Sequence, residues 1–286
     1  MKSNFNATII SCFLAILMLS CEVELSHTVK NVNLYEEKVL VHGFISIPEG
    51  VKVNVQKSLS SYHDQSKRVQ LSEVLLYKNN EPWINLFMLD SCTYVSTQNV
   101  NFSHTDSYKI YLKTVDGLEI TSEAQNIPPL PHFDTVVFTP YAYDYLNEIY
   151  YEFKDVDDEK QYYYVKVVQY IDSIEFNDNL PFFSCENIIY DTKKQNDKFS
   201  GIIKVPYYDS KVNRIEVRLY ALSGSLVKFL TSIRENEYLQ DEAYAENVYP
   251  IYSNITNGFG IFGAYAYSSK FFTVKPRNSK KDNFKN

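Results

Sequence analysis

The chain has 286 residues with a formal net charge of −7, and 45% of its residues are hydrophobic and 15% aromatic. This composition provides enough apolar side chains for a real core, which excludes a wholly disordered chain. The acidic balance argues against nucleic acid as a partner, and equally against binding to anionic lipid through overall charge.

An export signal opens the chain. Lys2 is followed by a nearly continuous apolar segment, Ala7 to Leu19, and then by Ser20 and Cys21. A positive start, an apolar centre and a small residue before a cysteine are typical of a bacterial lipoprotein signal peptide, here residues 1–20. The apolar segment is shorter than the roughly 20 residues that a membrane-spanning helix needs, so a retained anchor helix is not expected.

Cys21 is the predicted lipidation site. Acyl chains on this residue, palmitate among them, would hold the mature protein on a membrane, because each buried methylene group contributes about 0.8 kcal/mol. Cys12 imitates the same signal, but too few apolar residues precede it for export. An ordinary secretory signal that happens to contain a cysteine is the alternative interpretation. Residues 21–37 would then form a tether.

Residues 38–127 are predicted to form an Ig-like β-sandwich. Short β-branched and aromatic runs, several with period-two alternation, predict strands over 39–45, 51–55, 74–77 and 108–112. Turn signals lie between them at Pro48-Glu49-Gly50, Asn79-Asn80 and Asp116-Gly117. The polar, unpatterned segment from Ser58 to Arg68 is predicted to be a long loop, which is where binding residues tend to lie. Its candidate ligand contacts are Tyr62, His63 and Asp64.

The proline-rich segment Ile127-Pro128-Pro129-Leu130-Pro131 predicts a stiff boundary between two domains. Residues 128–275 are predicted to form a β-rich domain, followed by a disordered tail over 276–286. Its strands are expected over 136–138, 149–153, 162–170, 202–205 and 212–222.

One helix is predicted in this second domain, from Ser225 to Glu237. Leu226, Phe229, Leu230 and Ile233 recur there at helical spacing, and Ser223 is available as a cap. The predicted fold class is therefore mainly β, with two antiparallel sandwich-like domains in tandem and one or two helices near the carboxyl terminus of the second.

Two motifs that suggest a ligand have simpler interpretations. The acidic run Asp155 to Glu159 resembles a calcium loop in charge, but Lys160 and Lys166 stand where an EF-hand needs Gly and Glu. A solvated hairpin turn is the favoured interpretation. The segment Gly258 to Gly263 matches the dinucleotide motif G-x-G-x-x-G, but too few residues follow it for a βαβ unit. These glycines are instead expected to allow turns or close packing beside large rings.

The remaining reactive residues show no catalytic or metal-binding pattern. The five histidines, His27, His42, His63, His104 and His132, lack the spacing of metal ligands. There is no G-x-S-x-G turn, and neither Cys92 nor Cys185 has a histidine nearby in the sequence. The two cysteines are equally compatible with free thiols and with a disulfide. We therefore expect no enzyme, no cofactor and no metal, and a hydrolase with a dispersed site ranks last.

The segment from Tyr252 to Tyr265, YSNITNGFGIFGAY, follows the predicted helix, and lesser features lie at 39–43, 116–122 and 162–163. Together with the lipoprotein cysteine they resemble the DUF4249 family of Bacteroidota outer-membrane lipoproteins, in which the 252–265 segment looks like a signature. The resemblance implies a lipid-anchored protein of the outer membrane, exposed at the cell surface, of a kind often encoded near TonB-dependent transporters. It implies no assigned molecular function.

The functional expectation combines the anchor, the β-domains and the unpatterned loop. It is a non-enzymatic binding or accessory module of a TonB-dependent transport system, which contacts an outer-membrane barrel or its cargo through the loop from Ser58 to Arg68. The alternative is a structural or adhesive cell-surface protein.

Overall fold

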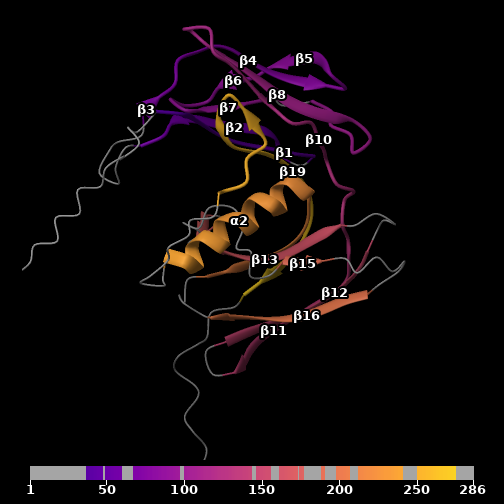
Figure 1. Ribbon diagram of the computed structural model, residues 1–286. Coiled ribbons are helices and arrows are strands. Elements are labelled where there is room, and N and C mark those ends of the chain that lie inside the picture. Colours follow the sequence, from indigo (N-terminus) through magenta and orange to yellow (C-terminus); the bar gives the residue numbers. More distant parts are fainter. Residues whose placement is uncertain are drawn as a thin grey trace, which may run out of the picture. The chain divides into compact units, whose positions relative to one another are not determined.

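Nearly all of the regular structure in the described part of the chain is β-structure (Figure 1). The computed structural model describes residues 37–47, 49–59, 67–96, 100–143, 146–155, 161–172, 174–176, 188–190, 198–206, 212–240 and 250–274. These residues hold strands in three sheets and one helix near the carboxyl end. The predicted fold class, mainly β with a helix near the carboxyl terminus, is confirmed.

A large sheet of ten strands runs through the whole described fold, in the order β14-β13-β17-β19-β1-β2-β7-β6, with β15 beside β13 and β3 beside β2. Its strands are β1 (Val39–Ser46), β2 (Gly50–Lys57), β3 (Lys67–Arg68), β6 (Phe87–Met88), β7 (Thr93–Val95), β13 (Tyr162–Ile171), β14 (Ile174–Phe176), β15 (Ile188–Tyr190), β17 (Arg214–Leu222) and β19 (Phe259–Thr273).

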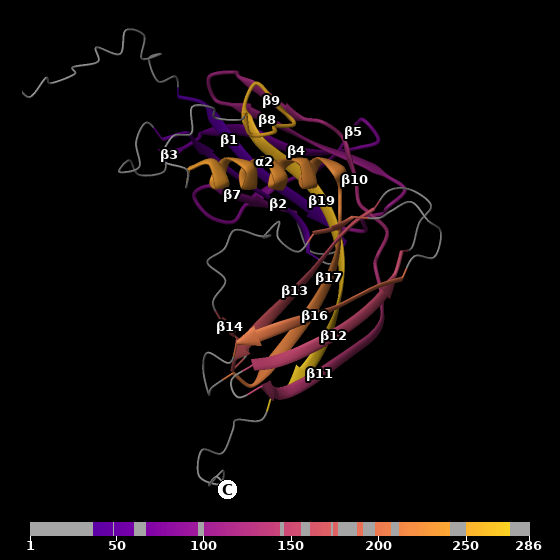
Figure 2. The same ribbon diagram turned by 60° about the horizontal axis from the view of Figure 1, so that its bottom comes forward.

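Two smaller sheets pack on one face of the large sheet. The first has six strands, β4 (Leu71–Lys78), β5 (Glu81–Asn85), β8 (Ser107–Thr114), β9 (Glu119–Ser122), β10 (Gln125–Asn126) and β18 (Ile255–Thr256). The second has three strands, β11 (Phe133–Tyr143), β12 (Leu146–Lys154) and β16 (Lys198–Pro206). Figure 2 shows the three-stranded sheet alongside β13 and β17.

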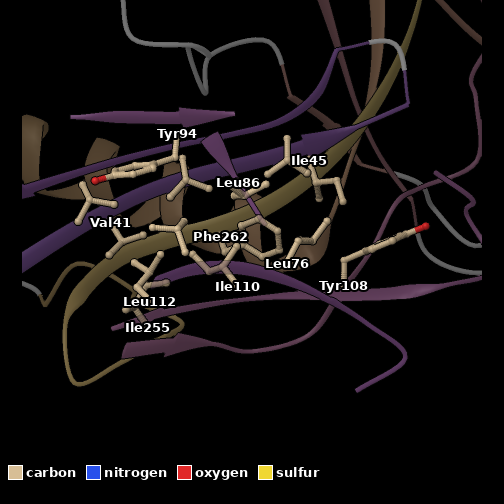
Figure 3. Packing of buried hydrophobic residues seen from close by; sticks show 14 of the residues in the cluster. Val41, Ile45, Leu76, Leu86, Tyr94, Tyr108, Ile110, Leu112, Ile255 and Phe262 are labelled. Carbon is tan, nitrogen blue, oxygen red and sulfur yellow. The ribbon is translucent and has the colours of Figure 1, made fainter. Parts of the chain in front are cut away.

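Alternation along the strands explains how the first core forms. In β8, Tyr108, Ile110 and Leu112 are fully buried while the residues between them are half-buried. Because side chains point to opposite faces of a strand in turn, such a pattern buries one face against a second sheet. Figure 3 shows Ile110 and Leu112 beside Phe262 and Val41 from the large sheet, with Tyr108 farther along the same core. This core takes most of its residues from the range 38–127 and the rest, Ile255, Phe262, Ala264 and Ala266, from near the carboxyl end of the chain.

The turns lie where the sequence predicts them. Asn79 and Asn80, which join β4 to β5, both have positive φ angles, 51° and 70°. Two such residues in succession form the hairpin turn whose twist matches that of the strands, and Asn tolerates this conformation better than most residues. Gly50 and Gly117 also have positive φ angles at their turns.

Strand β19 links the two predicted domains, whose boundary was placed between residues 127 and 128. It pairs in parallel with β1 through Leu40 to Ser46 and antiparallel with β17 through its second half. Phe262 and Ala264 of β19 belong to the first core, whereas a second core lies between the three-stranded sheet and β13 and β17. The boundary therefore separates most residues of two cores, but one sheet joins them.

Helix α2 (Gly224–Gln240) covers part of the opposite face of the large sheet. Ser223 caps it as predicted, because its side-chain oxygen accepts a hydrogen bond from the backbone N–H of Leu226. Leu226, Phe229 and Leu230 are buried against Phe44 of β1 and other residues of the sheet. Figure 2 shows the helix lying across β1, β2 and β19.

Candidate functional site

The residues singled out by the sequence for lipidation and ligand contact lie outside the described residues. They are Cys21, Tyr62, His63 and Asp64. The lipidation site and the contacts in the loop therefore stay predictions. The two ends of that loop are described, Ser58 following β2 and Arg68 ending β3, and they place its base at one edge of the large sheet.

A cleft lies beside the base of this loop, at the point where the chain passes from one sheet to another. Strand β5 pairs with β4 at the edge of the six-stranded sheet, and the chain then passes through Leu86 to β6, at the edge of the large sheet. The last link to β4 is the Leu86 N–H, which donates a hydrogen bond to the Val74 carbonyl at 2.9 Å. In the described part of the chain, Leu71 to Glu73 of β4 consequently have no strand on that side.

The cleft has a volume of about 580 Å³ and is open to solvent. We call it the edge cleft. It is lined by Arg68, Leu71, Ser72, Glu73, Val74, Asn85, Leu86, Phe87, Met88 and Tyr94. Its size is that of sites that bind a small ligand or a few residues of a peptide, and its lining mixes apolar surface with a few polar groups, as such sites do.

Large apolar side chains are exposed at the rim of the edge cleft. Phe87 is 55% exposed, Met88 53% and Leu89 65%, and these residues are consecutive. The Arg68 guanidinium lies against Met88, with Nη2 3.1 Å from Sδ, and among the described residues it has no carboxylate partner. A contiguous apolar rim with an uncompensated cation beside it is a surface that is suited to a partner.

The turn that follows this rim is closed by hydrogen bonds to Asp90. Asp90 Oδ1 accepts hydrogen bonds from the backbone N–H groups of Cys92 and Thr93, both at 2.9 Å. These hydrogen bonds hold the pKa of the Asp90 carboxyl below its ordinary value, and the bond from Cys92 has the largest effect. Cys92 lies half-buried in this turn and has no disulfide partner among the described residues. Cys185 lies outside the described residues, so the question of their pairing stays open.

A buried network of polar side chains lies elsewhere on the large sheet. The Tyr170 hydroxyl donates to Glu216, and Arg218 Nη2 donates to Glu216 Oε2 and to the Tyr170 oxygen, each at 2.8 Å. Burial raises the pKa of the Glu216 carboxyl, but the bonds from Arg218 and Tyr170 outweigh it, so the pKa lies below its ordinary value. The opposite charges compensate each other inside the fold, and Tyr170, Glu216 and Arg218 do not line the edge cleft.

The acidic run from Asp155 does not join a hairpin. The strands on either side of it, β12 and β13, lie in different sheets, so the connection crosses between sheets. The hairpin interpretation was wrong because local polarity predicts a turn but not the partner of each strand. Asp155, the described residue of the run, accepts a hydrogen bond from the Tyr163 hydroxyl. Residues 156–160 lie outside the described residues.

The G-x-G-x-x-G segment lies in and just before β19, and its glycines serve close packing. Gly260 has a φ of +117°, and a Cβ there would lie 2.1 Å from the Val41 carbonyl oxygen. A Cβ on Gly263 would lie 3.0 Å from Leu226 of α2, so this glycine lets the helix approach the sheet. The predicted close packing of the glycines is confirmed, but their neighbours are backbone and aliphatic side chains and not large rings.

Sequence reasoning missed the edge cleft. The run Phe87-Met88-Leu89 before the turn residues Asp90 and Ser91 is its one local signal, because three consecutive apolar residues cannot all face one core from a strand.

Among the described residues, no helix is both long and apolar enough to cross a membrane.

A family model described as a domain of unknown function, DUF4249, matches residues 24–271 of the chain. This match includes the whole of the first core, all of the second except Phe272 and Val274, the edge cleft and helix α2. Comparison with curated proteins gives no match. Since the family model spans most of its length, the chain belongs to the DUF4249 family.

Proposed function

We propose that this protein is a non-enzymatic binding module, held on the outer membrane by lipid at Cys21, whose edge cleft docks a segment of a partner protein. The observation that carries the proposal is the edge cleft itself, with its exposed apolar rim. Arg68, at the end of the predicted loop, is also one of its lining residues, which puts this described end of the loop beside the cleft.

The backbone around the cleft favours an extended peptide as the bound segment. Leu71 to Glu73 of β4 offer a strand edge that β5 leaves uncovered, and β6 is the last strand of its sheet. An extended peptide can add to such an edge as a further strand, with side chains entering neighbouring pockets. Phe87 and Met88 provide apolar contacts for those side chains.

The partner we propose is a barrel of a TonB-dependent transport system. This choice rests on the family resemblance and on the shared membrane: a lipid at Cys21 would confine both proteins to one surface. Confinement raises the effective concentration of each for the other, so a modest cleft would suffice for a lasting complex.

Capture of partners by a tagged, membrane-extracted protein tests the proposal. Phe87→Asp should lower recovery of the barrel, because a charge then replaces the exposed ring at the rim. Phe271→Asp is the matched control, since Phe271 is 56% exposed on β19, away from the cleft. Equal losses in both variants would remove the cleft from the interface, and capture of no barrel by the parent in any growth condition would contradict the binding function.

A structural or adhesive role is the second candidate, and the outer face of the three-stranded sheet favours it. Val137, Tyr150 and Ile202 are cross-strand neighbours there. Val137 is 47% exposed and Ile202 57%. A deletion strain with normal nutrient uptake but altered surface attachment would support this role over the first.

A further inference from the structure

The chain that would carry the lipid joins the described fold at Glu37, and this residue is held in place by two ion pairs. Its carboxylate lies 2.6 Å from Lys57 Nζ at the end of β2 and 3.3 Å from Lys67 Nζ in β3. The hydrogen bonds from Lys57 and Lys67 hold the pKa of Glu37 below its ordinary value, so the pairs persist at neutral pH. The tether therefore leaves the fold from a fixed point.

Cations gather around this point although the chain as a whole has a net charge of −7. They are Lys38, Lys57, Lys67 and Arg68. Strand pairing places Lys57 beside Lys67 and Gln56 beside Arg68. The carboxylates that act on Lys57 are Glu37 and Asp116. Glu119 and Glu73 act on the neighbouring Lys113, so five cations face four carboxylates at this end, a slight positive excess that contrasts with the acidic balance of the whole chain.

Exposed apolar residues surround these cations. Leu59 is 41% exposed, Val115 63%, Leu118 41% and Phe259 44%. The Nζ atom of Lys38 lies 4.8 Å from the centre of the Phe259 ring. The Val115 N–H donates to the carbonyl of Gln70, two residues after Arg68. Separate turns therefore bring apolar side chains to the same end of the sandwich as the cations.

We infer that this surface, which we call the tether end, docks on a phospholipid bilayer with anionic head groups, the one that holds the acyl chains of Cys21. The tether end comprises Lys38, Lys57, Leu59, Lys67, Arg68, Val115, Leu118 and Phe259. Lysine and arginine among exposed apolar and aromatic side chains suit the membrane interface, where the charges meet phosphates and the apolar groups enter the acyl boundary. The inference rests on the proposed lipid anchor.

Because of the tether, a surface with low affinity for the bilayer is sufficient for docking. Residues 21–36 can reach at most roughly 55 Å when fully extended, so the fold stays close to its bilayer even when undocked. Docking is then an intramolecular step at high effective concentration. The docked orientation would bring the edge cleft, which shares Arg68 with the tether end, near the rim of a protein embedded in the same bilayer.

Quenching of tryptophan by brominated phospholipid tests the docking. The protein is purified from membranes and reconstituted in vesicles of phosphatidylethanolamine and phosphatidylglycerol. The Trp83→Phe background removes the single native tryptophan. A new tryptophan is then placed by Phe259→Trp or, as the matched control, by Phe271→Trp. Both phenylalanines are exposed and lie in β19, the first at its start and the second near its end.

We expect brominated lipid to quench the tryptophan at 259 and to leave the one at 271 unquenched. Each cation at an anionic surface contributes about fivefold to occupancy. Lys38→Glu removes a cation and adds an anion, so it should lower quenching at 259 by more than that factor. Lys270→Glu should not change it. Equal quenching at both positions, or none at 259, would overturn the docking.

Failure of the docking can be told apart from failure of the anchor or of partner binding. Flotation of the parent with the vesicles reports the anchor, and barrel capture reports the edge cleft. A protein that floats and captures its barrel but shows no quenching at 259 overturns the docking alone. A protein that does not float overturns both the anchor and the docking.

Discussion

The side-chain amide of Asn254 hydrogen-bonds to both backbone groups of Phe262 and so takes the place of a neighbouring strand. Its Nδ2 donates to the Phe262 carbonyl, and its Oδ1 accepts from the Phe262 N–H, each at 2.9 Å. Strand β17 pairs with β19 only from Tyr265 onward, so this stretch of β19 needs another partner. Ser223 does the same for Ala264. Its side-chain oxygen accepts a hydrogen bond from the Ala264 N–H, and its backbone N–H donates to the Ala264 carbonyl.

Replacing Asn254 with Ala should destabilise the protein by about 3 kcal/mol, because it leaves a buried N–H and a buried carbonyl unsatisfied. Asn254→Asp should be no better, since one of its oxygens would face the Phe262 carbonyl. Urea unfolding followed by circular dichroism measures the change. The exposed Asn126, changed to Ala, is the control and should stay within about 0.5 kcal/mol of the parent. A parent-like midpoint for Asn254→Ala would show that the amide is dispensable.

Gly260→Ala should prevent folding or cost more than about 4 kcal/mol. The new Cβ would lie 2.1 Å from the Val41 carbonyl oxygen, and neither backbone can withdraw without breaking the parallel pairing of β1 and β19. Gly117→Ala is the matched control, because Gly117 also has a positive φ but nothing lies within 4 Å of its Cβ position. It should cost only the backbone strain, on the order of 1–2 kcal/mol. Thermal unfolding of both variants measures the difference, and equal losses would contradict the steric argument.

The local elements of this fold could be predicted from the sequence, because their cause is local. Alternation in β8 and the helical spacing of Leu226, Phe229 and Leu230 report which face each element buries, and Ser223 and Asn79-Asn80 mark ends and turns. These are short-range preferences of the backbone and of amphipathic faces. The sequence also predicts close packing at the glycines of the 252–265 segment, but not the hydrogen bonds from Asn254 to Phe262.

The pairing of distant segments could not be predicted in this way. Nothing in the pattern of β1 says that Leu40 to Ser46 will pair in parallel with β19, from the other end of the chain. The edge cleft was hidden for the same reason. It exists because β5 and β6 belong to different sheets, and a pattern of residues does not reveal which strand edges remain uncovered.

His42 should make the protein less stable as the pH falls below neutrality. It lies on β1 with its ring 6.0 Å from that of Phe229 in α2, and burial lowers its pKa from the ordinary 6.5. The unfolded chain then binds a proton at a higher pH than the folded one, so the free energy of unfolding falls as the pH drops through 6.5 toward the folded pKa. His42→Gln should flatten this part of the stability curve in urea titrations between pH 7.5 and 5.5. A parent-like slope in His42→Gln would assign the pH dependence to other groups.

Cys21→Ala should remove the protein from its membrane or leave it at the wrong one. Without the thiol there is no residue to acylate, and each lost methylene group removes about 0.8 kcal/mol of membrane attachment. Cys12→Ala is the matched control, because Cys12 lies in the same apolar segment but has too few apolar residues before it to direct export. Fractionation of cells, with mass spectrometry of the amino-terminal peptide, reads both effects: acyl chains should be found on residue 21 in the parent and in Cys12→Ala. If Cys21→Ala remains on the outer membrane as firmly as the parent, attachment must come from the folded body, and the tether end would then be the first surface to alter.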